Sequence, residues 1–261
     1  MINFDKIVNK MWKKWWKVIF KEEIYELIDP EKKPEYQTQV DKIIYRLKSE
    51  NHIIAIRNGV YIVPLKEDRE LNEIDLLEKY YYKFLKKFIT QNVGSEYFIT
   101  WKKSLEFHMK NYEIPEKIFV MNRVLNKKIM IGNYTIIFKT STTTLNKKSL
   151  NLFSRLKKYS FPEEIYWVGF RIAWLELALF ESALIENNEW VDVSLLNKSL
   201  KKYAKYFKTE VFYDLGSLKY TMSLNRLKEL SKWIDVKLSE IFLDIIKKNG
   251  WLFVGESLRK M

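Results

Sequence analysis

A short stretch near the N-terminus concentrates side chains suited to contacts with a polyanion. Glutamine, hydroxyl, lysine and arginine side chains follow one another there between positions 36 and 58. Glutamine can pair with an adenine edge through two hydrogen bonds, while lysine and arginine neutralise phosphates. The candidate DNA-contacting residues are Tyr36, Gln37, Thr38, Gln39, Lys42, Arg46, Arg57 and Asn58.

Two consecutive elements must position these side chains. Apolar residues at helical spacing predict an amphipathic helix over 36–51, with Gln39, Lys42 and Arg46 as its outward stripe. Residues 52–64 follow at once as two short strands around a turn at 57–59. The predicted buried face of the helix is Val40, Ile43, Ile44 and Leu47.

A helix that runs into a hairpin with a basic tip is typical of a winged helix. In that fold the helix enters the major groove, and the hairpin contacts the backbone or the minor groove. Tyr36, Gln37 and Thr38 would lie at the helix N-terminus, which favours phosphate. The alternative is a winged helix that contacts only proteins.

Two further predicted helices, N-terminal to residue 36, complete the winged-helix domain. Residues 4–19 are predicted to form a basic amphipathic helix, with Trp12, Trp15, Trp16 and Ile19 on one side. Packing of that side into the core is favoured over phosphate contact, and phosphate contact over membrane contact. A short helix over 21–28, stopped by Asp29-Pro30, follows. We therefore expect a winged helix-turn-helix domain over 1–65.

Residues 66–261 are expected to form a mixed α+β, helix-rich C-terminal domain. The segment 66–73 is a linker or helix start, and 74–90 and 101–110 are predicted helices. Strands are predicted at 97–100, 118–121, 128–131 and 134–138, with a turn at Gly132-Asn133. Beyond Leu150 the predicted elements are a short strand at 164–169 and helices at 170–185, 195–207 and 224–249, the last interrupted near Asp235.

Composition limits the classes of function. The formal charge of +13 over 261 residues favours polyanions, although a solvated surface explains most of it because the basic residues are spread along the chain. The absence of cysteine excludes disulfides, cysteine-ligated zinc and thiol catalysis, and fits the cytoplasm. The most apolar segment, 170–185, is interrupted by charges and is shorter than the ~20 residues of a membrane span. We expect a cytoplasmic protein without membrane contact.

No constellation in the sequence predicts catalysis. His52 and His108 lack acidic neighbours at metal-ligand spacing, so structural roles are favoured. Glu176 and Glu181 lie in the most apolar segment, where pairing within the fold is favoured over acid–base catalysis. The run TSTTT at 140–144 is predicted to be a loop. We expect no enzyme activity, cofactor or metal.

Several short motifs, in order, resemble those of the AbiEi-type antitoxins. RNGVY at 57–61 is similar to that family's wing end, and YFITWKKSLEFH at 97–108 to its strand-then-helix segment. IFVM at 118–121 and IGNYTIIF at 131–138 resemble its paired strands. In AWLELALFE at 173–181, Ala173, Glu176, Ala178 and Leu179 fit a family helix motif, Glu181 stands where aspartate is usual, and Leu177 departs from a common arginine.

The resemblance spans roughly residues 20–235 and implies a function. It implies an N-terminal winged helix that represses its own operon, and a C-terminal domain that counteracts a nucleotidyltransferase-like toxin. The N-terminal Trp/Lys helix and the chain beyond about 235 depart from the family pattern. A plasmid or phage replication or partition protein with the same winged helix is the alternative. Double-stranded DNA is the expected partner, bound by a monomer or a DNA-induced dimer.

Overall fold

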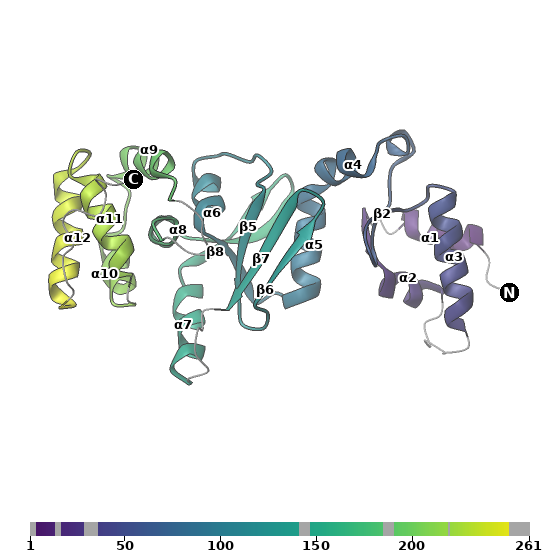
Figure 1. The fold of residues 1–261 in the computed structure, drawn as a ribbon, viewed down its shortest axis with the longest axis horizontal. Helices are drawn as coiled ribbons and strands as arrows, with labels where there is room; N and C mark the ends of the chain where they lie inside the picture. Colours follow the sequence, from purple (N-terminus) through teal and green to yellow (C-terminus); the bar gives the residue numbers. More distant parts are fainter. Residues whose placement is uncertain are drawn as a thin grey trace. The chain divides into compact units, whose positions relative to one another are not determined.

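The fold is mixed α+β and divides into two compact units (Figure 1). We describe a computed structural model, in which residues 4–13, 17–28, 36–140, 147–184, 191–218 and 220–250 are described. The first unit comprises residues 1–92 and 130–134, and the second comprises 93–129 and 135–261. The division falls later than the expected boundary at 65/66 because two further helices belong to the first unit.

The first unit combines helices with a small sheet. Its three strands are antiparallel in the order β1-β3-β2, which places the third strand of the chain in the centre. Figure 1 shows α1, α2 and α3 gathered on one side of this sheet. The elements are α1 (Phe4–Lys13), β1 (Val18–Phe20), α2 (Lys21–Ile28), α3 (Gln37–Ser49), β2 (Ile54–Arg57) and β3 (Val60–Ile62).

One hydrophobic cluster holds these elements together. It takes residues from α1, β1, α2, α3 and β3: Ile7, Met11, Ile19, Ile24, Val40, Ile44, Leu47, Ile53, Tyr61 and Val63. Trp12 packs against the cluster, as expected for the tryptophan side of α1. The predicted helix over 4–19 is too long, because Ile19 lies in β1 and pairs with Tyr61. Trp15 and Trp16 lie outside the described residues.

A helical extension follows the small sheet. A 3₁₀ turn (Lys66–Asp68) leads to α4 (Glu73–Lys79) and α5 (Tyr81–Val93), so the predicted continuous helix over 74–90 is interrupted at Tyr80. The Asp68 carboxylate is buried and accepts hydrogen bonds from Lys79 Nζ, at 2.5 Å, and from the Tyr80 hydroxyl. The Lys87 ammonium of α5 bonds the Val18 carbonyl at 2.6 Å and pairs with Glu23 at 2.7 Å. The contacts of Lys87 join α5 to β1 and α2 within the first unit.

The second unit is built on a mixed sheet. Its strand order is β6-β7-β5-β4-β9-β8, with β4 antiparallel to β5 and parallel to β9, and β5 parallel to β7. The predicted strands at 97–100, 118–121, 128–131 and 134–138 are confirmed within a residue or two. The strands are β4 (Tyr97–Thr100), β5 (Lys117–Asn122), β6 (Lys127–Ile131), β7 (Tyr134–Thr140), β8 (Ser160–Ile165) and β9 (Val168–Ala173).

Helices make up the rest of the second unit. They are α6 (Trp101–His108), α7 (Lys147–Lys157), α8 (Leu175–Ser182), α9 (Val193–Tyr203), α10 (Thr209–Gly216), α11 (Thr221–Ser231) and α12 (Val236–Lys248). The interruption near Asp235 is confirmed, and its side chain caps α12 through Leu238 N at 3.1 Å. Helix α10 was not predicted. Of the run TSTTT, Thr140 ends β7 and 141–144 lie outside the described residues.

The predicted strand at 164–169 and helix at 170–185 are wrong in their boundaries. Residues 160–173 form a β-hairpin, and only Leu175–Ser182 is helical. The turn is Tyr166-Trp167, whose φ angles of 48° and 64° lie in the left-handed region. This region favours Asn and Gly, which are absent here, so the turn carries no sequence signal. No helix among the described residues has the length and apolarity needed to cross a membrane.

Candidate nucleic-acid interface

Helix α3 presents two different faces. Val40, Ile44 and Leu47 are buried on the side that meets the core. The chain leaves the helix through Asn51, whose φ of 54° is left-handed, while His52 N bonds the Leu47 carbonyl at 2.9 Å. This C-terminal arrangement directs the backbone straight into β2. The sequence pattern therefore orients the helix as expected.

The eight predicted contact residues are all exposed. Gln37, Thr38 and Gln39 form the first turn of α3, with Tyr36 at its N-cap position. Among the residues that the structure describes, no side chain caps this end, so the backbone N–H groups of the first turn have no side-chain acceptor from them. Such an uncapped N-terminus is suited to a phosphate oxygen.

The hairpin tip is fixed next to α3 by one residue of α2. Lys21 N donates to the Gly59 carbonyl at 2.8 Å, and Lys21 Nζ pairs with Asp41 of α3 at 3.0 Å. Gly59 adopts a φ of 78°, which a two-residue turn needs and which glycine accepts without strain. The tip residues Arg57 and Asn58 are thereby held on the α2 side of α3, with both side chains exposed.

The charges on α3 are only partly available to a ligand. Hydrogen bonds from the Tyr25 hydroxyl and the Lys21 ammonium lower the pKa of the Asp41 carboxyl, so it stays ionised and compensated. Lys42 makes no hydrogen bond or ion pair with any residue that the structure describes. Its ammonium is therefore an exposed cation on the outward face that no described residue pairs with.

Arg46 differs from the other predicted residues. Its Nε pairs with Glu50 Oε1 at 2.6 Å, and its guanidinium lies 3.9 Å from the centre of the Phe4 ring. The side chain remains exposed, but its charge already has a partner within the helix. We therefore expect Arg46 to contribute less to phosphate binding than Lys42.

The sequence prediction missed Tyr45. Its side chain is 71% exposed and lies three residues after Lys42 on the outward face of α3. An aromatic ring at this position can pack on sugar or on a thymine methyl group. The helical spacing from Lys42 could have identified it, but the predicted stripe followed the Gln39–Arg46 edge instead.

The other candidate groups are engaged within the fold. His52 Nε2 lies 3.3 Å from Glu50, and His108 Nε2 lies 2.9 Å from the Ala173 carbonyl oxygen. Burial lowers the pKa of His108. Glu176 accepts from Lys208 N at 2.8 Å, and Glu181 accepts from the Tyr220 hydroxyl at 3.1 Å. These contacts agree with the structural roles expected for all four residues.

The described residues offer no metal site, since no group of three or more His, Cys, Asp or Glu side chains converges among them. The surface of α3 and the hairpin tip gather exposed polar side chains of the types that contact phosphates and base edges.

Comparisons with known proteins give a likeness of fold. No protein-family model matches the sequence. No curated protein sequence matches it either. A crystal structure of the RV2827C protein from Mycobacterium tuberculosis superimposes with a TM-score of 0.58, at 12% sequence identity, over 94% of this chain and 80% of that chain. The chain is thus similar to that protein in fold.

Proposed function

We propose that this chain is a DNA-binding transcriptional regulator whose first unit is a winged helix. The observation that carries the proposal is the exposed outward face of α3. There the helix N-terminus, Gln39 and Lys42 lie together, and neither the helix end nor Lys42 has a side-chain partner among the described residues. Glutamine suits recognition of an adenine edge in the major groove, and lysine suits phosphate. The order α1-β1-α2-α3-β2-β3 supports the winged-helix assignment.

The hairpin supports the same proposal. In a winged helix the hairpin lies beside the recognition helix and adds contacts to the backbone or minor groove. Arg57 and Asn58 occupy its tip, and Lys21 links this tip to α3. The hairpin has only a two-residue turn, so it would reach a phosphate close to the helix rather than a distant groove.

We propose further that the regulator is of the AbiEi antitoxin type. The support is the sequence resemblance in RNGVY at 57–61 and in 97–108, which here form the end of the hairpin and the β4–α6 segment. On this proposal the protein represses its own operon, and its second unit counteracts a nucleotidyltransferase-like toxin. The proposed location is the cytoplasm.

A salt-titrated binding assay tests the DNA-binding proposal. The full chain would be titrated with the duplex upstream of its own gene, in the presence of unrelated DNA of equal length. We expect specific binding that survives the competitor and weakens steeply with salt. Equal binding to both duplexes, or none, would contradict a specific regulator.

Co-expression tests the antitoxin part separately. We expect the adjacent gene to encode a nucleotidyltransferase-like protein that arrests growth, and this chain to relieve the arrest. A neighbouring replication initiator, or binding to repeats at an origin, would instead support the replication or partition alternative.

A further inference from the structure

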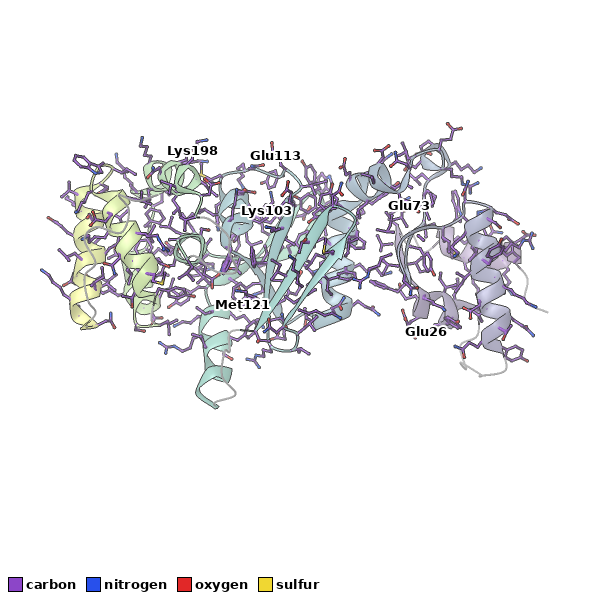
Figure 2. The ribbon with its side chains drawn as sticks, in the orientation of Figure 1. Glu26, Glu73, Lys103, Glu113, Met121 and Lys198 are labelled. Carbon is purple, nitrogen blue, oxygen red and sulfur yellow. The ribbon has the colours of Figure 1, made fainter. Side chains whose placement is uncertain are left out.

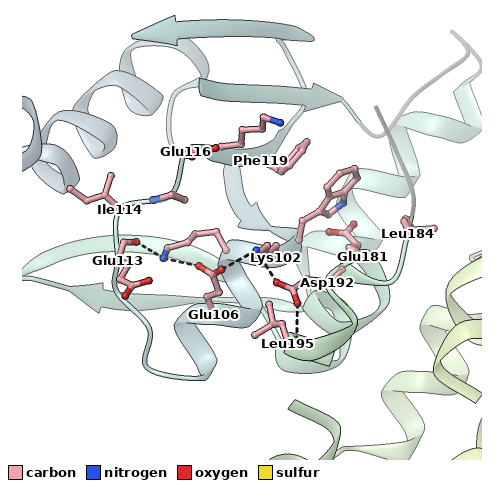
Figure 3. A pocket seen from close by; sticks show the side chains of 15 residues that line it. Lys102, Glu106, Glu113, Ile114, Glu116, Phe119, Glu181, Leu184, Asp192 and Leu195 are labelled. Atoms are coloured by element: carbon pink, nitrogen blue, oxygen red, sulfur yellow. Dashed lines mark hydrogen bonds and ion pairs between the residues drawn. The ribbon is translucent and has the colours of Figure 1, made fainter. Parts of the chain in front are cut away.

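The second unit contains a pocket that the proposed function does not use. It has a volume of about 270 Å³ and lies where the start of α6, the loop over 109–116, the end of α8 and the start of α9 meet (Figure 3). Ligand pockets commonly begin at about 300 Å³, so the volume limits an occupant to a small molecule or a single side chain. Among the residues that line the pocket are Trp101, Lys103, Glu113, Ile114, Glu116 and Phe119.

One wall of the pocket is apolar and rigid. The rings of Trp101 and Phe119 lie with centroids 4.0 Å apart, and Ile114 and Pro115 line the pocket on the loop. Trp101 adopts a φ of 61°, a left-handed conformation that is strained for a bulky residue. Strained residues cluster at binding sites, where the surrounding structure holds them in place.

Two of the three lysines that line the pocket, Lys102 and Lys103, already pair with carboxylates of the chain. Lys103, which is labelled together with Glu113 in Figure 2, is almost fully buried. Its Nζ donates to Glu106 at 2.9 Å, to the Glu113 carbonyl at 2.5 Å and to the Asn111 carbonyl at 3.3 Å. These three acceptors use all the donors of an ammonium group. Lys102 pairs with Asp192 at 2.9 Å. Neither cation is therefore free to attract an anionic ligand.

The N-termini of α6 and α9 are also not free to attract an anionic ligand. Asp192 caps α9 by accepting from Leu195 N at 2.9 Å, so the N-terminus of α9 already faces a carboxylate. Glu106, at the second turn of α6, compensates the lysines at the start of that helix. The positive ends of both helices thus meet carboxylates of the chain itself.

The remaining charge of the pocket is negative. Its lining holds five carboxylates against three lysines, in a chain whose net charge is +13. The carboxylate of Glu116 is exposed at the loop and makes no ion pair or hydrogen bond with the described residues. The Ser182 hydroxyl is buried and also lacks a hydrogen-bond partner among them. The pocket therefore combines an apolar wall with acceptors for a positive donor.

We propose that this pocket binds a small organic cation, in which a primary ammonium or a guanidinium is carried on an apolar body. The cationic group lies at Glu116 and Glu113, and the apolar body packs against Trp101, Phe119 and Ile114. The cation is either a free amine or the side chain of a basic residue in a peptide. This proposal does not depend on DNA binding by the first unit.

Calorimetric titration of the full chain tests the proposal. The probes are phenethylamine, its neutral analogue phenethyl alcohol, agmatine, and arginine with both termini blocked. We expect phenethylamine to bind at least tenfold more tightly than the alcohol. Tighter binding of agmatine than of blocked arginine would assign a free amine, and the reverse order would assign a peptide side chain.

Two kinds of variant locate the site. Replacing the rim carboxylates (E113Q with E116Q) should weaken binding at least tenfold, while removing two exposed carboxylates elsewhere in the second unit (E164Q with E240Q) should leave it unchanged. Ile114→Trp should fill the pocket and abolish binding. Equal binding of the amine and the alcohol, or unchanged binding by the rim and Ile114 variants, would overturn the proposal.

Discussion

Charged side chains have opposite environments in the two compact units. On α3 of the first unit, Lys42 is exposed and has no ion-pair partner among the described residues. In the second unit, Lys103 is 2% exposed and bonded to three acceptors. Both residues count equally toward the net charge of +13. Net charge alone therefore does not locate a polyanion-binding surface, whereas the pairing of each cation does.

The largest expected effect comes from removing the buried ammonium. Lys103→Met should lower the free energy of unfolding by about 3–5 kcal/mol, because Glu106 and two carbonyls lose a buried partner. Urea denaturation of the full chain measures the change. The adjacent control is Lys102→Met. The Lys102 side chain is 57% exposed, so this substitution should cost at most about 1 kcal/mol. Equal losses in the two variants would contradict the contrast between buried and exposed lysines.

A buried carboxylate in the first unit gives the next largest effect. Asp68→Asn should cost about 2–3 kcal/mol at pH 7, because Lys79 and Tyr80 lose an ionised acceptor. Burial alone raises the pKa of Asp68, but the hydrogen bonds from Lys79 and Tyr80 outweigh it, so the pKa lies below the ordinary 3.8.

The pH dependence of this loss follows from the lowered pKa. The stabilisation by Asp68 is complete above pH 3.8 and disappears as the pH falls through the lower folded-state pKa. The difference between wild type and Asp68→Asn should therefore shrink in acid. Glu70→Gln, at an exposed carboxylate two residues after Asp68, is the matched control and should change stability by no more than about 0.5 kcal/mol. A loss that does not change with pH would contradict an ionised Asp68.

Substitution of an uncharged residue of α3 distinguishes recognition of the DNA sequence from binding to phosphates through charge. Gln39→Ala should reduce discrimination between specific and unrelated DNA by about 1–3 kcal/mol and leave the salt dependence unchanged. Competition binding at several salt concentrations measures both quantities. Gln91→Ala, an exposed glutamine of α5, is the control. A changed salt slope in Gln39→Ala would show that the substitution shifts the position of α3 on the DNA, and does not simply remove one base contact.

The smallest effect concerns the strained hairpin of the second unit. Replacing Tyr166-Trp167 by Asn-Gly should raise stability by about 1 kcal/mol, because both positions have positive φ. Thermal unfolding measures the change. Replacement by Ala-Ala retains the strain and serves as the control. Destabilisation by Asn-Gly would show that the contact of Tyr166 with Tyr112, at a centroid distance of 5.8 Å, outweighs the strain.

Local periodicity predicted the first unit more accurately than the second. The spacing of Val40, Ile44 and Leu47 fixed the orientation of α3, and β2 and β3 followed where the sequence placed them. In contrast, Phe170 and Ile172 are as apolar as a buried helix but belong to β9, which is buried between β4 and β8. The strand does alternate, since Gly169 and Arg171 are less buried than Phe170 and Ile172, but the alternation is short and runs almost directly into the apolar residues of α8. The two elements therefore merged into one predicted helix.

The sequence alone predicts only some of the contacts that charged side chains make. The interaction of Arg46 with Glu50 follows from their spacing of four residues, but the packing of its guanidinium on Phe4 depends on the fold. The pocket of the second unit gathers residues from four separate segments, and none of them forms a local motif. The sequence could predict which residues of α3 face outward. It could not predict which of their charged groups already pair within the fold.

The measurement that tests the central claim most directly is the salt dependence of DNA binding by Lys42→Ala with Arg57→Ala. If both side chains neutralise phosphates, the slope of log K against log salt should fall by about 2 and the affinity should drop. The control removes the same charge from exposed lysines of β6, Lys127→Ala with Lys128→Ala, and should retain the wild-type slope. Equal slopes for wild type and both double variants would contradict a DNA interface formed by α3 and the hairpin tip.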